Sequence, residues 1–148
     1  MRFEYLFLAD AANSAADGKI NVLGLGVRIL TYSELPASSP LVIVGAVEAT
    51  VEEAGDYALR VELFEPDGTI EELVNAAAKV TTEVKDSRVP TGIGFTIALS
   101  RPFRQEGVHV IRATVANEVA QYAFVVRRRE GAASTPGDEA TIAAATTG

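Results

Sequence analysis

The sequence predicts an all-β protein, an antiparallel immunoglobulin-like β-sandwich of about seven to nine strands with a disordered C-terminal tail. Three observations support this class. Apolar side chains recur at every second position along most of the chain, as at Leu59, Val61 and Leu63. Residues that favour turns follow at intervals of about 8 to 14 residues. Only one segment has helix-forming composition, and no other stretch shows the period of an amphipathic helix with convincing caps.

The length and composition suit one domain. The chain has 148 residues, of which 48% are hydrophobic, and this is enough to build a core without metal or disulfide support. We assign the β-sandwich domain to residues 1–129. After this point the sequence becomes small, polar and free of aromatic residues, so residues 130–148 are predicted to be a flexible low-complexity tail.

Four strands are expected in the first part of the chain. Their apolar, β-branched residues cover the ranges 3–10, 19–25, 27–32 and 40–53. The loop 11–18 ends in an Asp-Gly turn, and the loop 33–40 contains two prolines.

Five more strands are expected in the second part, at 56–64, 69–84, 92–100, 107–115 and 119–128. The segment 69–84 combines three helix-forming alanines with valines and threonines, and we interpret it as a strand, either continuous or interrupted. Alternation in the last two strands predicts which side chains face the core: Ile111, Ala113, Val115, Tyr122, Phe124 and Val126.

The N-terminal stretch YLFLADAANSAADGKINVLGLG resembles the opening of an uncharacterised bacterial family of small β-sandwich proteins. In that family a first strand ends in Ala-Asp, here Ala9–Asp10. A Gly-Lys turn follows, here Gly18–Lys19, and then a strand that ends near a glycine, here Gly24. The strand that begins at Gly107 and its hairpin partner, residues 122–126, are also similar. The resemblance covers about residues 3–129 and implies a fold but no established activity or functional residues.

Gly24 and Gly26 follow a predicted strand and could open a dinucleotide-binding loop. That fingerprint needs a third glycine three residues later and a helix whose N-terminus holds the pyrophosphate. Ile29 occupies that position, its neighbours are strand-like, and Glu48, near the expected ribose-binding position, lies in another strand. We interpret the glycines as a bend where the chain passes from one sheet to the other, and we predict no cofactor.

Asp10, Asn13 and Asp17 lie close together at the first predicted loop and could suggest calcium. Calcium requires about six to eight oxygen ligands, which an EF-hand-like loop supplies at every second residue. The spacings here do not match that pattern. We therefore favour hydrogen bonding within a turn, and we predict no metal site.

His109 is the only histidine, so a catalytic triad or a histidine metal site would have to use it. It shares the phase of the inward Ile111, which favours a buried structural histidine with satisfied hydrogen bonds. The pairs Glu52–Glu53 and Glu71–Glu72 could suggest glycosidase chemistry, but neighbouring strand residues point to opposite faces. The sequence thus contains no catalytic constellation, and we expect a protein that is not an enzyme.

The net charge of −7 argues against nucleic acid as a partner. We interpret the basic run Arg127–Arg129 as a solvated strand end that blunts edge pairing, in preference to a phosphate site. Glu4 and Asp10 bracket the only apolar run near the N-terminus, which is too short for a signal peptide, and no segment is long enough to span a membrane. With no cysteine in the chain, we expect a cytoplasmic protein without membrane partners.

These observations predict a non-enzymatic protein-interaction or structural module. Its partner would be another protein or a second copy, bound through an exposed sheet face or edge. The alternative is an accessory domain that binds a small ligand or carbohydrate through the end loops 11–18, 33–40 and 85–92. Only Tyr32, at the border of one loop, could supply an aromatic platform for a sugar.

Overall fold

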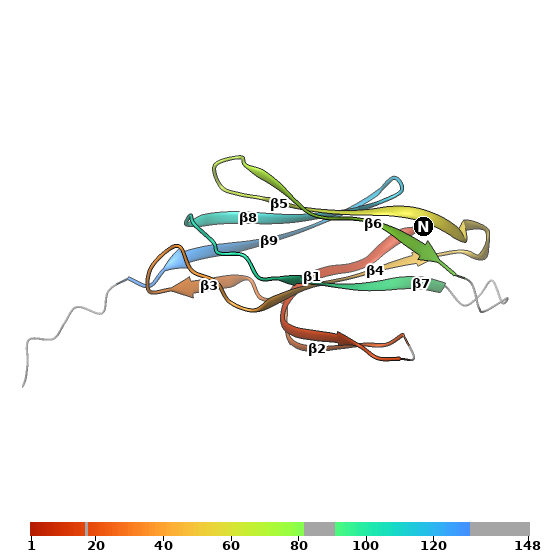
Figure 1. Cartoon of the computed structure of the whole chain (residues 1–148), viewed down its shortest axis with the longest axis horizontal. Helices are drawn as coiled ribbons and strands as arrows, with labels where there is room; N and C mark the ends of the chain where they lie inside the picture. The colour runs from red at the N-terminus through yellow and green to blue at the C-terminus, as the bar shows by residue number, and fades with distance from the viewer. Residues whose placement is uncertain (17, 82–90, 131–148) are drawn as a thin grey trace, which may run out of the picture.

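The computed structural model describes residues 1–16, 18–81 and 91–130, which form two β-sheets packed face to face (Figure 1). One sheet has the strand order β2-β1-β4-β7 and the other the order β3-β9-β8-β5-β6. The strands are β1 (Arg2–Ser14), β2 (Ile20–Leu25), β3 (Ile29–Tyr32), β4 (Leu41–Ala49), β5 (Gly55–Phe64), β6 (Ile70–Val80), β7 (Thr91–Leu99), β8 (Gly107–Val115) and β9 (Glu118–Arg128). The predicted all-β class and strand number are confirmed.

The core lies between the two sheets and follows the alternation in the sequence. The inward residues predicted for the last two strands, from Ile111 to Val126, are all buried. They pack against Leu59, Val61 and Leu63 of β5 and against apolar residues of β1 and β4. Burying such side chains contributes about 1.5–3 kcal/mol each. The period-two pattern therefore identifies the face that drives the two sheets together.

One strand pair is parallel, which corrects the prediction of an antiparallel sandwich. β3 runs parallel to β9, with Ile29 opposite Val125 and Tyr32 opposite Arg128. β3 does not reach the second sheet through a hairpin, because the chain crosses to it from β2 in the first sheet. A crossing between sheets sets the strand direction, and alternation of side chains carries no information about direction.

The ambiguous segment forms a strand with one irregularity. β6 pairs with β5, and the register shifts where Val61 faces Val74 but Glu62 faces Glu72. Leu73 is therefore an extra residue on β6, which is the arrangement of a β-bulge. The strand interpretation is confirmed for residues 70–80, whereas residues 82–84 lie outside the described part.

The fourth predicted strand is shorter than expected. β4 ends at Ala49, and Val51–Glu53 form a single turn of 3-10 helix, η1. Glu53 closes this turn, because its carboxylate accepts a hydrogen bond from the Thr50 backbone NH at 2.9 Å. Local capping chemistry thus ends the strand before Glu52 and Glu53.

The first strand is longer than expected, because β1 continues to Ser14 through most of the predicted loop 11–18. Its register with β2 runs from Ala9 opposite Leu25 to Ser14 opposite Ile20. In Figure 1 this part of the chain bends away from the sandwich and lies below the sheet that contains β4 and β7. Across the described ranges, no helix has the length and apolar character needed to cross a membrane.

Candidate functional site

The β1–β2 hairpin, residues 9–25, is the feature of the fold that stands apart from the sandwich. The Ala15 backbone NH donates to the Lys19 carbonyl at 2.7 Å, and the Gly18 NH donates to the Ala15 carbonyl at 3.0 Å. Gly18 has a φ of 81°, a conformation that glycine adopts without strain. This turn chemistry matches the Asp-Gly signal in the sequence and reverses the chain tightly.

β2 is an edge strand, and its free backbone groups can be assigned. Because the pair Ala15–Lys19 is hydrogen bonded, the alternation of an antiparallel ladder makes the odd-numbered residues of β2 the ones bonded to β1. Ile20 and Val22 therefore direct their NH and CO groups away from β1, whereas the positive φ of Gly24, 67°, interrupts the regular alternation at that residue. β2 hydrogen-bonds to no other described strand, so this row of groups is open to a further strand.

Large apolar side chains project from the same strand. Leu23 is 71% exposed and Leu25 is 64% exposed, and Val22 is also exposed. Leu23 and Val22 line a shallow apolar depression together with Ala11 and Ala12 of β1. No residue from Ile20 to Leu25 carries a charge. An uncharged edge strand with exposed leucines is the combination that folded proteins usually avoid unless a partner covers it.

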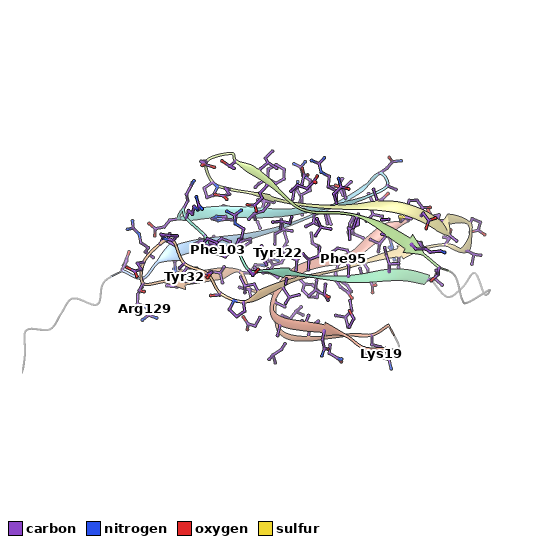
Figure 2. All side chains as sticks on the ribbon, in the orientation of Figure 1. Lys19, Tyr32, Phe95, Phe103, Tyr122 and Arg129 are labelled. Carbon is purple, nitrogen blue, oxygen red and sulfur yellow. The ribbon has the colours of Figure 1, made fainter. Side chains whose placement is uncertain are left out.

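The other face of the hairpin packs against the outer face of the sandwich. The Ile20 side chain approaches Gly94 of β7 so closely that a Cβ at Gly94 would lie 2.6 Å from the Ile20 Cδ1 atom. A groove of about 580 Å³ remains between them, lined among others by Tyr5, Lys19 and Glu48. Figure 2 shows Lys19 at the hairpin end, below the two sheets. The glycines of β7 thus leave room for the hairpin and for the groove.

The structure confirms the interpretation of Gly24 and Gly26 as a crossing between sheets. Both have positive φ, 67° and 82°. After Gly26 the chain leaves β2 in the first sheet and enters β3 in the second. The backbone NH groups of Gly26 and Val27 both donate to the Leu8 carbonyl, which fixes the turn. No helix follows the glycines, so the helix N-terminus that binds pyrophosphate in a dinucleotide site is missing here.

The loop assigned to Asp10 and Asn13 is a strand, so the turn interpretation was wrong for both. Asn13 accepts a hydrogen bond from the Asn21 side chain at 3.1 Å across the hairpin. The Asp10 carboxylate packs against Gly24, where a Cβ would overlap it. Asp17 lies outside the described residues. Among the side chains that the structure describes, no three of the types that bind metals are grouped to hold an ion.

His109 is buried on the inward face, as its phase with Ile111 predicted. Its ring stacks on Phe124 and meets Phe103 edge-on, with centroid distances of 5.4 Å in both cases. The expectation of satisfied hydrogen bonds is only half met. Nδ1 lies 3.2 Å from the Gly107 carbonyl, but Nε2 has no hydrogen-bond partner among the described residues. Burial lowers the pKa of His109, which favours the neutral ring.

The paired carboxylates do not converge on one point. Glu71 bonds Arg101, and Glu72 bonds Arg60 at 2.9 Å, so the two side chains have different partners. Glu53 pairs with the N-terminal amine, while Glu52 is exposed on the same short helix. The prediction that Glu52 and Glu53 lie on a strand and point to its opposite faces was therefore wrong. Neither pair has the facing geometry that glycoside hydrolysis requires.

The basic run lies where β9 ends beside β3. Arg127 donates to the Thr31 hydroxyl at 3.2 Å, and Arg128 bonds Glu106 at 3.0 Å. All three arginines are exposed, as expected for a solvated strand end. However, β9 lies between β3 and β8, so the run does not blunt an edge. Alternation cannot reveal strand order, and this part of the interpretation was wrong.

Of the three end loops proposed for ligand binding, 33–40 lies at one end of β4, whereas the described residues Gly18, Thr91 and Gly92 of the other two line one groove. The loop 33–40 leads into Leu41, which pairs with Leu99, whereas Thr91 lies opposite Ala49. These positions are at the two ends of β4, and Ala11–Ser14 of the first loop belong to a strand. Residues 85–90 lie outside the described part. Strand pairing therefore separates segments that look equivalent in the sequence.

Sequence reasoning missed the folding-back of the hairpin and the open edge of β2. A signal was present, because Leu23 and Leu25 are two large apolar residues on one face of the strand, with a glycine between them. The sequence could not show which strands lie on either side of β2. An apolar residue on a strand looks the same whether a second sheet covers it or solvent does.

Comparison with known proteins identifies a family but no activity. A family model described as a family of unknown function matches residues 4–127. No curated protein sequence matches the chain. Two crystal structures of a β-glucosidase from Listeria innocua, with isofagomine and with glucose, are similar at a TM-score of 0.49 and 12% identity. The alkylpurine DNA glycosylase AlkC of Pseudomonas fluorescens, bound to DNA with an abasic site analogue, is similar at 0.44 and 11%.

These likenesses cover 84% and 85% of this chain. The chain spans only 16% of the β-glucosidase and 30% of the glycosylase. At this level of similarity nothing about catalysis or ligands carries over from them.

Proposed function

The chain belongs to DUF6941, a family of unknown function, and we propose that it is a non-enzymatic β-sandwich that binds another protein chain along β2. The single observation behind this proposal is the open, uncharged edge of β2, which carries the exposed Leu23 and Leu25. An extended segment that pairs with such an edge gains backbone hydrogen bonds, and alternate side chains give it specificity.

The other sheet edges are less suited to this role. β6 carries Glu71, Glu72 and Lys79, and charge on an edge disfavours pairing. β3 is only four residues long. β7 is uncharged, but none of its side chains is among the exposed large apolar ones. β2 alone among the described edge strands combines absence of charge, free backbone groups and exposed leucines.

Several features support binding in preference to catalysis. The single histidine is buried among aromatic rings, away from solvent. The carboxylates with resolved partners are bound to arginines or to backbone groups, which holds them in structural roles. The two-layer architecture fits an immunoglobulin-like sandwich. We propose the cytoplasm as the location, because the absence of cysteine from the sequence fits a reducing compartment.

A photo-reactive amino acid placed at Leu23 tests the proposal in cells that express the protein. We expect covalent adducts with a protein chain from this position, and mass spectrometry should map the adduct to an extended segment. The same group at Val119, which is 55% exposed at the far turn of β9, is the matched control and should give no adduct. If Leu23 gives no adduct or only those seen from Val119, binding along β2 is wrong.

The groove beneath the hairpin favours a second candidate, which is binding of a small ligand. Its volume of about 580 Å³ lies within the range of small-molecule sites, and Tyr5 offers an aromatic ring. Gly18, Thr91 and Gly92 of the predicted end loops line it. A thermal-shift screen with sugars and divalent metals should raise the melting temperature if this candidate is correct. No shift at millimolar ligand would remove it.

A further inference from the structure

We propose that the chain that pairs with β2 is a second copy of the same protein, and that two sandwiches join edge to edge through antiparallel β2 strands. This inference rests on the proposed function and names its partner. The twofold axis would cross β2 near Val22. This residue lies near the middle of β2 and directs its backbone groups outward.

Backbone complementarity is the first argument. A twofold interface brings the same surface together from both copies, so the surface must match itself. An antiparallel pairing centred on Val22 places Val22 of each copy opposite Val22 of the other. The outward-directed NH and CO groups of this residue then meet those of its counterpart, without any change to the β1–β2 ladder. The two four-stranded sheets would become one continuous sheet.

Charge is the second argument. The chain has a net charge of −7, so two copies repel each other over most orientations. The hairpin is an exception, because Ile20–Leu25 and the facing segment Ala11–Ser14 contain no charged residue. Two copies can therefore approach here without placing like charges together.

The charges that flank this neutral segment favour the antiparallel arrangement. Lys19 lies at one end of β2, and Asp10 packs against Gly24 near the other end. In the register centred on Val22, Lys19 of each copy lies opposite Leu25 of the other, so the two lysines are kept apart. A parallel pairing in register would place Lys19 beside Lys19. Charge thus disfavours the parallel orientation.

Apolar contact is the third argument. Leu23 and Leu25 lie on one face of β2, and in the pairing near Val22 the Leu23 side chains of the two copies become diagonal neighbours. Diagonal neighbours across a strand pair are within reach of long side chains. The leucines of both copies would form one strip across the joint sheet. This contact would cover the most exposed large apolar side chain of the described residues, Leu23 at 71%.

Sedimentation equilibrium of the full chain tests the proposal. We expect a reversible monomer–dimer equilibrium, with a dissociation constant that rises at least tenfold, about 1.4 kcal/mol, in Leu23→Lys. Val22→Pro should have the same effect, because it removes only an outward-directed NH, a position where an edge strand tolerates proline. Val119→Lys, which changes an exposed valine on the other sheet, should leave the constant unchanged. Circular dichroism confirms that each variant is folded.

A single cysteine provides an independent test, since the natural chain has none. Opposed residues in a bonded antiparallel pair have Cα atoms about 5.5 Å apart, within the range for a disulfide. Under oxidising conditions Val22→Cys should form a covalent dimer, and Val119→Cys should not.

A strict monomer at every concentration would overturn self-association. A dimer that Leu23→Lys and Val22→Pro leave intact, with no disulfide from Val22→Cys, would also overturn it. In either case the proposed function survives if the photo-reactive group at Leu23 forms adducts with a different protein, and it fails too if no adduct forms.

Discussion

His109 shows how one buried side chain affects stability. Its ring lies between Phe103 and Phe124, and Nε2 has no hydrogen-bond partner. A buried polar atom without a partner costs about 1–3 kcal/mol. Because burial lowers the pKa of His109 in the folded state, the unfolded chain binds a proton more readily below the ordinary value of 6.5. Stability therefore falls as the pH decreases through this region.

We expect His109→Phe to change the free energy of unfolding at pH 8 by no more than about 1 kcal/mol, because an aromatic ring of similar size replaces the imidazole. Below pH 6.5 the wild type loses stability with a slope of at most about 1.4 kcal/mol per pH unit, and the variant should lack this contribution. Urea denaturation over a pH series measures both effects. An unchanged slope in His109→Phe would show that another group titrates.

Gly45 is required by close packing inside the sandwich. It faces inward from β4, and a Cβ at this position would overlap the ring of Phe95 on β7. Phe95 and Gly45 are directly opposed in the β4–β7 ladder. Aromatic rings often cover a glycine on a neighbouring strand, since the absent side chain leaves room for the ring.

Gly45→Ala should therefore destabilise the protein by about 1–3 kcal/mol, because the Phe95 ring must move within a packed core. Gly55→Ala is the matched control, since a Cβ there would meet only ordinary contacts with Tyr57. It should change stability by less than about 0.5 kcal/mol. Thermal unfolding of both variants measures the difference, and equal effects would refute the packing argument.

At the level of elements, the crossing from β2 to β3 is held by β9. The Tyr122 hydroxyl donates to the Val27 carbonyl at 2.9 Å, and the guanidinium carbon of Arg28 lies 4.1 Å from the centre of the Tyr122 ring. The Val125 NH donates to the Arg28 carbonyl at 2.8 Å. A crossing segment has no ladder of its own, so these contacts from β9 fix its path.

Tyr122→Phe should cost about 1–2 kcal/mol of stability, because it leaves the Val27 carbonyl without its donor while the aromatic ring remains. Tyr5→Phe is a suitable control, since stacking of Tyr5 on Phe7 at 5.0 Å does not need the hydroxyl. It should lie within about 0.5 kcal/mol of the wild type. If the two variants are equally stable, the hydroxyl of Tyr122 does not support the crossing.

The hairpin and the sandwich also differ in how many neighbouring strands support them. The inner strands are hydrogen bonded on both sides, whereas β1 is the one described strand that hydrogen-bonds to β2, and Ile20 contacts β7 near Gly94. An element with few buried contacts gains stability when a partner covers it. This difference explains why the hairpin, and not the packed core, is the surface that we assign to recognition.

For the whole molecule, the division between the sandwich and the segment after residue 130 stays a prediction from composition. We expect deletion of residues 131–148 to change the melting temperature by less than about 2 °C, since a polar segment without aromatic residues contributes little to a core. Differential scanning calorimetry of the shortened chain measures this. A large decrease would show that the segment packs on the sandwich, and sedimentation of the same sample would show whether it affects association.

Alternation in the sequence by itself determined the all-β class, the inward face of β8 and β9 and the buried place of His109, because side chains on a strand point to opposite sides wherever the strand lies. Gly24 and Gly26 likewise indicated the crossing, since positive φ belongs to glycine.

The tertiary structure alone decided which strands are neighbours. It placed β3 parallel to β9, extended β1 through the expected loop to Ser14, and left β2 at an open edge with Leu23 and Leu25 exposed. These features depend on contacts between residues far apart in the chain, and an apolar pattern records that a face is to be buried without recording what buries it.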